Sequence, residues 1–328
     1  MLRFHRNIPT ICIFVCCILP GSSALQSATC PGVTPGDESR DLGPVVSGTE
    51  PVRVVAIGDF GLPDRKGRPD SDQTKVAKAI AVYHKQNPFD LGLTVGDNFY
   101  CSTPLFSVGC GGLSSPADPK LHALFEQPYS SLKIKFYATL GNHDYFSNWE
   151  NEVCATKPNG LWQMPFQYYT FRAGPVQFFA LDTALTSAAS LKEMGEALKS
   201  AWAHQLQWFE RELEAKKDVK CKVAYGHRPV YSSGWEGGEP ELQGAFLRLL
   251  KKYRVTYIAG HDHTLERIEK DGLQFFVTGG GGGSGGRPPL HFQGNRFFFP
   301  THGFLVLTAD DRDLKIALVN SEGEVLWP

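Results

Sequence analysis

The segment VRVVAIGDFG, residues 52–61, joins a strand-like run to a polar turn. Residues 52–57 are apolar and β-branched apart from Arg53, which predicts a β-strand. Gly58-Asp59-Phe60-Gly61 follows at the strand's end, where glycine permits a tight turn and a close backbone approach. Taken alone, a Gly-Asp pair after a strand is an ordinary turn. The segment decides the fold because its pattern returns along the chain.

Strand-like runs alternate with helical patterns through most of the sequence. The other expected strands are 90–95, 134–140, 176–181, 221–225, 255–259 and 273–278, and the expected helices are 71–86, 118–130, 199–216 and 240–253. In the helix at 199–216, Trp202, Leu206, Phe209 and Leu213 fall on one buried face. The alternation predicts a layered α/β fold, closed by an antiparallel pair at 303–308 and 314–319.

Metal-binding residue types follow five of these strands. The motifs are Gly58-Asp59, Gly96-Asp97-Asn98-Phe99-Tyr100, Gly141-Asn142-His143-Asp144, Gly226-His227 and Gly260-His261-Asp262-His263. Ligand crevices of open α/β sheets lie at the carboxyl ends of strands, so distant segments can converge there. Burying so many carboxylates and imidazoles without a metal would be costly, and this mixture of oxygen and nitrogen donors suits iron, zinc or manganese. The sequence therefore predicts two metals that share a carboxylate.

The order of these motifs resembles the calcineurin-like metallophosphoesterase superfamily. The motif GDNFY, which ends in Tyr100, resembles the corresponding motif of the purple acid phosphatases, especially those of the small tartrate-resistant type. The resemblance spans about residues 53 to 308. It implies an α/β layered sandwich in which mixed β-sheets are flanked by helices. It also implies a dinuclear metal site at the carboxyl ends of the strands.

The resemblance further implies a role for each motif residue. Fe(III) would be bound by Asp59, Asp97, Tyr100 and His263, and a second metal, Fe(II), Zn or Mn, by Asp97, Asn142, His227 and His261. Phosphate monoesters would be hydrolysed by a metal-bound hydroxide. Asn142 and His143 would contact the substrate, with His143 as the catalytic group and Asp144 orienting its loop.

One position departs from the family pattern. The small animal enzymes carry a histidine nine residues after the Gly-His histidine, and here that count from His227 reaches Glu236. A carboxylate among the substrate-binding residues would repel a phosphate, which makes substrate preference the open question. Two alternatives therefore stand: a phosphodiesterase or nucleotide pyrophosphatase, and a non-catalytic scaffold similar to the glideosome-associated protein of apicomplexan parasites.

Charge and the amino terminus indicate the cellular context. With 33 Lys and Arg against 34 Asp and Glu, the net charge is −1, which argues against a nucleic-acid partner. Residues 1–24 resemble a signal peptide, and their apolar run at 11–19 is too short to span a bilayer. We expect a flexible leader at 25–50, a catalytic domain at 51–328 without a membrane span, and secretion or residence in an acidic vesicle. The expected partners are small-molecule or protein phosphate esters.

Cysteines and glycines raise two further questions. Removal of residues 1–24 leaves Cys30, Cys101, Cys110, Cys154 and Cys221, of which Cys101 and Cys110 bracket a loop and could pair, while pairing of either with Cys154 is the rival. Cys221 is expected to be a buried thiol. The glycine-rich run 279–286 is either a flexible loop or a close-packed loop beside the metals. The remaining histidines, His84, His122, His204, His291 and His302, are expected to be structural or exposed.

Overall fold

A computed structural model gives the fold of residues 39–48, 51–101, 110–186, 196–286, 288–290 and 295–327. The expected signal peptide and the first part of the expected leader lie outside these described residues, as do Cys30 and His291. No helix in the described ranges combines the length and the apolar character that a membrane crossing requires.

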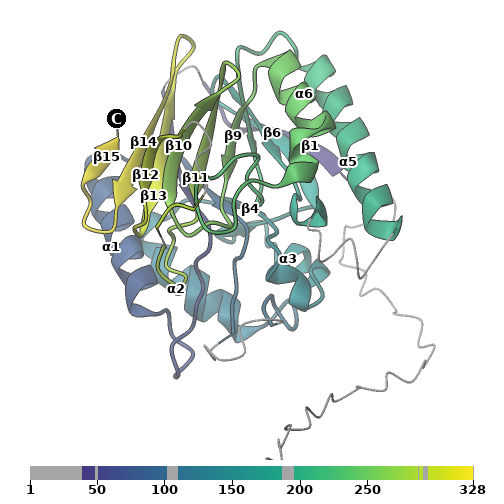
Figure 1. The fold of residues 1–328 in the computed structure, drawn as a ribbon. Coiled ribbons are helices and arrows are strands. Elements are labelled where there is room, and N and C mark those ends of the chain that lie inside the picture. Colours follow the sequence, from purple (N-terminus) through teal and green to yellow (C-terminus); the bar gives the residue numbers. More distant parts are fainter. Residues whose placement is uncertain are drawn as a thin grey trace, which may run out of the picture.

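Two β-sheets pack face to face, with helices on the outside of each (Figure 1). One sheet has the order β1 (Ser39–Val46), β6 (Tyr168–Ala173), β7 (Val176–Ala180), β8 (Cys221–Tyr225), β9 (Thr256–Ala259), β11 (Leu273–Thr278), β10 (Leu265–Lys270) and β12 (Asn295–Phe299). The other has the order β15 (Val325–Trp327), β14 (Leu314–Asn320), β13 (Gly303–Ala309), β2 (Val52–Ile57), β3 (Leu91–Val95), β4 (Phe136–Thr139) and β5 (Trp162–Gln163). This confirms the predicted mixed sheets flanked by helices.

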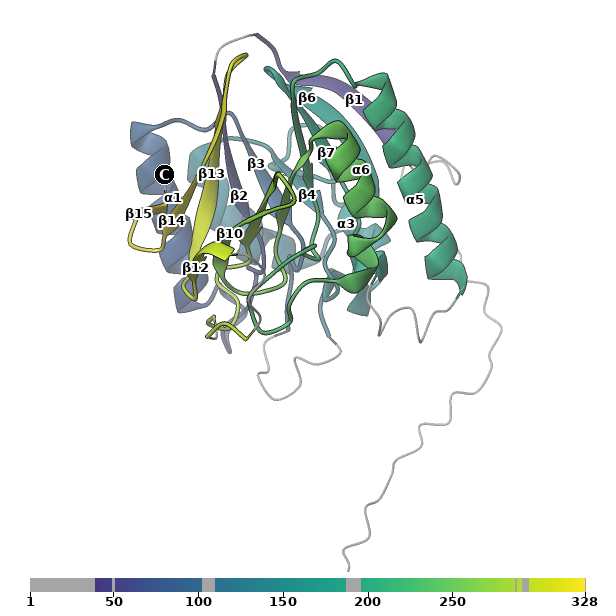
Figure 2. The same cartoon turned by 45° about the horizontal axis from the view of Figure 1, so that its top comes forward.

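Three apolar clusters hold the layers together. Between the sheets lie buried side chains of both, among them Val54, Leu93 and Phe178. α1 (Ser71–Gln86) and α2 (Gln127–Tyr129) cover the sheet that contains β2, and α5 (Glu196–Ala215) and α6 (Ala245–Tyr253) cover the other (Figure 2). Along α5, Trp202, Phe209 and Leu213 are buried and Leu206 is half-buried, as the helical pattern predicted. The described residues also contain shorter helical segments: η1 (Leu121–Glu126), η2 (Ser130–Leu132), η3 (Asp144–Phe146), α3 (Glu150–Cys154), η4 (Ala184–Thr186) and η5 (Pro240–Gln243).

Parallel pairing brings the motif-bearing strand ends to one edge. β2, β3 and β4 run parallel to one another, and so do β7, β8, β9 and β11. The backbone N–H of Gly58 donates to Thr278 O at 2.9 Å, which joins the end of β2 in one sheet to the end of β11 in the other. The turns that follow the strands of both sheets therefore meet.

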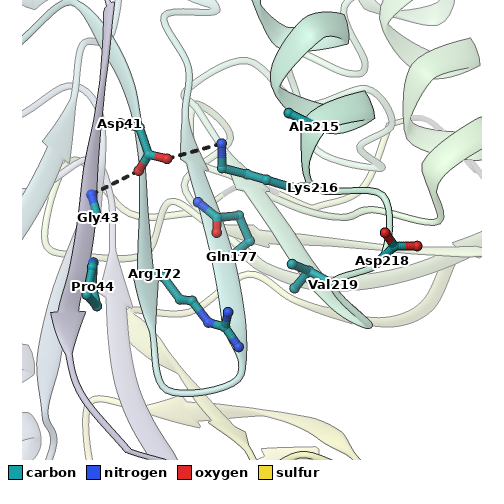
Figure 3. Close-up of a pocket in the computed structure, with 9 residues that line it drawn as sticks. All are labelled: Asp41, Gly43, Pro44, Arg172, Gln177, Ala215, Lys216, Asp218 and Val219. Atoms are coloured by element: carbon teal, nitrogen blue, oxygen red, sulfur yellow. Dashed lines mark hydrogen bonds and ion pairs between the residues drawn. The ribbon is translucent and has the colours of Figure 1, made fainter.

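The expected flexible leader is wrong for residues 39–46, which form β1. β1 pairs in parallel with β6, because backbone hydrogen bonds and the half-buried side chains of Leu42, Val45 and Val46 offset a composition poor in large apolar residues. Asp41 ties the strand to the end of α5 through an ion pair with Lys216, whose Nζ lies 3.1 Å from its carboxylate (Figure 3). Folded chain therefore begins before residue 51.

The structure decides between the two disulfide pairings considered for Cys101 and Cys110. Cys101 and Cys110 form a disulfide, which excludes the rival pairing of either with Cys154. Cys154 is disulfide-bonded as well. Cys221 is a free thiol, partly exposed rather than fully buried as expected, and burial raises its pKa.

Candidate metal centre

The turns after the strands place three carboxylate or imidazole side chains on strained backbone. Asp59, Asp97 and His261 have φ angles of 55°, 49° and 72°, in the left-handed region. Such conformations cost about 1–3 kcal/mol each in non-glycine residues and concentrate at functional sites. Gly141 shows why glycine borders them, since a Cβ there would lie 2.1 Å from the backbone nitrogen of Asp97. These turns therefore orient the side chains of Asp59, Asp97 and His261 at the expense of a strained backbone.

One half of the site gathers around the Tyr100 hydroxyl. It lies 3.1 Å from Asp97 Oδ2, 3.3 Å from Asp59 Oδ1 and 3.4 Å from His263 Nε2. His263 Nε2 is also 3.4 Å from Asp59 Oδ1. Asp59 and Asp97 are buried, and Tyr100 is nearly so. Four side chains from three separate turns therefore point their oxygen and nitrogen atoms at one spot.

The other half gathers around the second oxygen of Asp97. His227 Nε2 lies 3.4 Å from Asp97 Oδ1 and 3.1 Å from Asn142 Oδ1. The opposite ring nitrogen of His227 is 3.0 Å from Val95 O, which fixes the ring orientation. Ligand atoms of Asp97, His227 and His261 all lie within 4.8 Å of one another. Asp97 thus presents one oxygen to each half of the site.

The donor set fits two metal ions. Carboxylate, phenol, amide and imidazole donors without a thiolate suit iron, zinc or manganese. The seven side chains converge from both sheets, and their burial would be costly without a cation among them. The structure brings together all the residues that the sequence analysis assigned to the two metals, namely Asp59, Asp97, Tyr100, Asn142, His227, His261 and His263.

The charges of the site shift the acidity of its residues. Burial works against the charged form of Asp97, but His227 and His143 hold the pKa of Asp97 far below its usual value. Burial and the negative charges of Asp97 and Asp59 raise the pKa of Tyr100. Asp59 outweighs the effect of burial on His263 and raises its pKa to about 9. Asp59 and Asp97 therefore place negative charge around Tyr100 and His263, which favours a cation in that half of the site.

His143 lies beside the two halves rather than within either. Its backbone N–H donates to Asp97 Oδ1 at 2.8 Å, and its ring packs against Tyr100 with centroids 4.5 Å apart. His143 Nε2 is 3.9 Å from Asp97 Oδ2, and the side chain is 21% exposed. The ring is therefore held at the centre while remaining reachable from solvent.

A buried acidic cluster supports the turns from behind. The Asp144 carboxylate accepts hydrogen bonds from the backbone N–H groups of Gly141 and Asn98, at 2.8 and 3.0 Å. Asn98 also donates to Glu152, whose pKa is raised far above its usual value by burial and by the neighbouring Asp144. Burial and Asp97 raise the pKa of Asp144 to about 7. Asp144 thus holds the turns of Asp97 and Asn142 in register, as expected for a residue that orients the loop.

The glycine-rich run is closely packed at 279–283 and 286, beside the converging side chains, whereas Ser284 and Gly285 are exposed. Gly283 donates its N–H to Asp59 O at 2.7 Å, and a Cβ on Gly283 would lie 2.8 Å from His263 Cε1. His263 Nδ1 is 2.5 Å from Ser284 O. At the closely packed positions glycine is needed because a side chain would collide with neighbouring backbone or with the turns that carry the converging side chains.

The described histidines outside the motifs, His84, His122, His204 and His302, stay away from the centre. His84 accepts a backbone hydrogen bond from Phe89, and His122 pairs with Glu126 at the surface. His204 is exposed on α5, and His302 lies 3.0 Å from Gly283 O behind the glycine-rich loop. Their expected structural or surface roles agree with these positions.

Two residues of the site were not expected from the sequence. Arg228 follows His227 directly, and its Nη1 lies 2.6 Å from His261 Nε2. Its Nε is buried without a hydrogen-bond partner among the described residues. Asp262 lies between the two histidines of its motif and turns away from them to accept three hydrogen bonds from the segment 232–237. Adjacency to motif histidines was the only sequence signal for either.

Glu236 lies at the mouth of the site. It lines a small pocket with His261 and His263. The sequence analysis placed it among the substrate-binding residues, and its position beside two of the seven converging side chains is compatible with that role.

Comparisons with known proteins agree with the fold and the motifs. The family model described as calcineurin-like phosphoesterase matches residues 52–265. The chain is 30% identical to tartrate-resistant acid phosphatase type 5 of Sus scrofa, in a match that covers 90% of this chain and 91% of that protein.

Two solved structures share the fold. GAP50, the anchor in the inner membrane complex of Plasmodium, matches with a TM-score of 0.71, 23% identity and coverage of 84% of this chain and 87% of its own. Purple acid phosphatase PPD1 from yellow lupin, Lupinus luteus, matches with a TM-score of 0.62, 20% identity and coverage of 85% and 53%.

Proposed function

Because this chain belongs to the calcineurin-like phosphoesterase family, we propose that it is an acid phosphatase that hydrolyses phosphate monoesters at a dinuclear centre of Fe(III) with Fe(II), Zn or Mn. Asp59, Tyr100 and His263 would hold the first metal, Asn142, His227 and His261 the second, and Asp97 both. When bound, such a centre supplies Lewis acidity and lowers the pKa of a water molecule. The two oxygens of Asp97, each facing a different half of the site, are the observation that carries the proposal.

His143 is the proposed catalytic side chain. Its ring is fixed by the backbone contact to Asp97 and by packing on Tyr100, so a phosphate at the centre would lie within reach of its Nε2. In that position it would donate a hydrogen bond to a phosphoryl oxygen or a proton to the departing alcohol. Asn142, half-buried next to it, would contribute its amide to the same phosphate.

Replacing the shared carboxylate tests the proposal. We expect Asp97→Ala to lose bound metal and to lower the rate of aryl phosphate hydrolysis by at least about 10³-fold, because both halves of the site lose a ligand. Metal content by mass spectrometry and initial rates on a monoester and a diester make the measurement. Asp313→Ala, at an exposed turn, is the control and should behave as wild type. Full activity of Asp97→Ala would overturn the mechanism, and faster diester hydrolysis by the wild type would favour the phosphodiesterase alternative.

A non-catalytic scaffold is the second candidate, and one contact favours it. The Arg228 guanidinium lies against His261 Nε2, the atom that would bind the second metal, and must move aside for that metal to enter. If the wild type binds no metal after incubation with iron and zinc salts, a non-catalytic scaffold becomes the better-supported function. Two metals per chain together with hydrolysis of an aryl phosphate would remove it, since Arg228 would then have moved aside and the centre would be active.

We further propose an oxidising lumen or the cell exterior as the site of action. The Cys101–Cys110 disulfide supports this, because such bonds persist in oxidising compartments. Phosphate esters of small molecules or proteins are the proposed substrates. The balanced charge of the chain speaks against nucleic acid.

A further inference from the structure

A carboxylate and an aromatic ring lie together beside the candidate centre. The pocket that Glu236 shares with His261 and His263 is also lined by Trp235, and it measures about 100 Å³. Trp235 is 49% exposed and Glu236 is exposed. The pocket has room for only a few non-hydrogen atoms, so it suits part of a substrate rather than a whole one.

The loop that carries these two side chains is fixed to the metal-binding turn. Asp262 accepts hydrogen bonds from the N–H groups of Glu236 and Gly237, at 2.9 and 3.1 Å, and from the Ser232 hydroxyl at 2.5 Å. Gly234 makes this wrapping possible, since a Cβ there would lie 2.3 Å from the Asp262 carboxyl carbon. The position of Glu236 relative to His261 and His263 is therefore set by the fold.

Negative charge from this loop reaches into the site. Burial lowers the pKa of Arg228, while the charges of Asp97, Glu239 and Glu236 oppose that effect. Glu236 lines the same pocket as His261 and His263, so it lies beside the place where a phosphate would bind. A carboxylate there disfavours a purely anionic ester but favours one whose alcohol is positively charged.

We propose that Trp235 and Glu236 form a subsite for the alcohol portion of the substrate and select phosphate monoesters of amino alcohols. This inference rests on the proposed phosphatase function. The phosphate would lie at the seven converging side chains, and the ammonium of a short aminoalkyl group would extend into the pocket. There the carboxylate pairs with the ammonium, and the indole ring offers a face to which cations bind.

Two non-hydrolysable ligands of equal size test the subsite. In 2-aminoethylphosphonate an ammonium stands where n-propylphosphonate has a methyl group, so the difference in affinity reports the charge alone. We expect the metal-loaded wild type, in titration calorimetry, to bind the aminoethyl compound about fivefold more tightly, as an ion pair at an open pocket would give. In Glu236→Gln, which keeps the size and removes the charge, the ratio should fall to about one.

Matched variants and a parallel assay make the outcome decisive. Glu241→Gln, an exposed acid outside the pocket, should keep the fivefold ratio. Equal binding of the two phosphonates by the wild type, or an unchanged ratio in Glu236→Gln, would overturn the subsite. Aryl phosphate hydrolysis measured on the same sample separates the two proposals. A protein that prefers the aminoethyl compound but hydrolyses no aryl phosphate would support the subsite and overturn the phosphatase proposal. A protein that hydrolyses aryl phosphate but binds both phosphonates equally would support the phosphatase proposal and overturn the subsite.

Discussion

Gly141 shows how much of this site depends on single residues. It lies between the end of β4 and Asn142, and no side chain fits there, because the turn of Asp97 crosses directly over it. Gly96, in the turn that precedes Asp97, packs against the same place from the other side: its φ is 85°, and a Cβ on it would lie 2.7 Å from the backbone nitrogen of Gly141. At this scale the sequence was informative, since each glycine stands next to a motif residue.

Replacement of Gly141 by alanine should therefore damage both stability and metal binding. The added methyl group meets backbone rather than a flexible side chain, so we expect a loss of at least about 3 kcal/mol in unfolding free energy. Chemical denaturation and metal analysis measure the two effects. Gly285→Ala is the matched control, because Gly285 has no positive φ and the nearest atom to its added Cβ is 3.9 Å away. Equal stability of the two variants would contradict this account of the turn.

At the scale of elements, the segments between strands carry the function. The loop 232–237 and the turn between β9 and β10 are separate in sequence, yet Asp262 joins them through three hydrogen bonds. The glycine-rich run after β11 is joined to the end of β2 by backbone hydrogen bonds, from Gly281 N–H to Gly58 O and from Gly283 N–H to Asp59 O. The shape of the candidate metal centre therefore depends on loops that hold one another in place.

Removal of the Asp262 carboxylate should release the loop 232–237. Asp262→Ala leaves buried donors without an acceptor, which costs about 1–3 kcal/mol for each group that water cannot reach. We expect a stability loss of about 2–4 kcal/mol and faster hydrogen exchange at Glu236 and Gly237. Glu210→Ala, at an exposed ion pair on α5, is the control and should cost less than about 1 kcal/mol. Unchanged exchange at Glu236 in Asp262→Ala would show that the loop is held by other contacts.

At the scale of the whole molecule, buried acids tune stability to pH. Burial raises the pKa of Asp182 to about 6 and that of Glu266 to about 7. A carboxyl group whose pKa is higher in the folded than in the unfolded chain binds more protons when folded. Its contribution is complete below the unfolded pKa and is lost as pH rises through the folded pKa. These two groups therefore favour the folded chain under acidic conditions.

Asp182 gives the cleaner test because it lies outside the metal centre. Between about pH 3.8 and pH 6, its ionisation should remove about 3 kcal/mol of unfolding free energy, given the pKa shift from 3.8 to about 6. Asp182→Asn should lose that pH dependence, so the difference between wild-type and variant curves isolates this group. Glu210→Gln should run parallel to wild type. Parallel curves for Asp182→Asn as well would contradict the assignment.

The sequence by itself predicted the layered α/β class, α1 and α5, and the seven converging side chains. It also predicted the strands β2, β3, β4, β7, β8, β9, β11, β13 and β14. It succeeded because buried strands have strong apolar patterns and because glycine and metal-ligand residue types coincide at their ends. It missed β1, β5, β6, β10, β12 and β15. Of these, β1 and β6 pair with each other, which supplies the stability that local composition lacks. The expected helix at 118–130 is confirmed as a helical segment, in which the π-helical η1 is followed by the short α2.

Only the tertiary structure decided how separate segments meet. Nothing in the sequence links Asp262 to Glu236, or Arg228 to His261, because these contacts depend on loops that cross between strands. The same holds for the glycine-rich run, whose composition alone was equally compatible with a flexible loop. Local pattern determines which side chains are delivered to a strand's end, whereas packing between distant turns determines where each side chain then points.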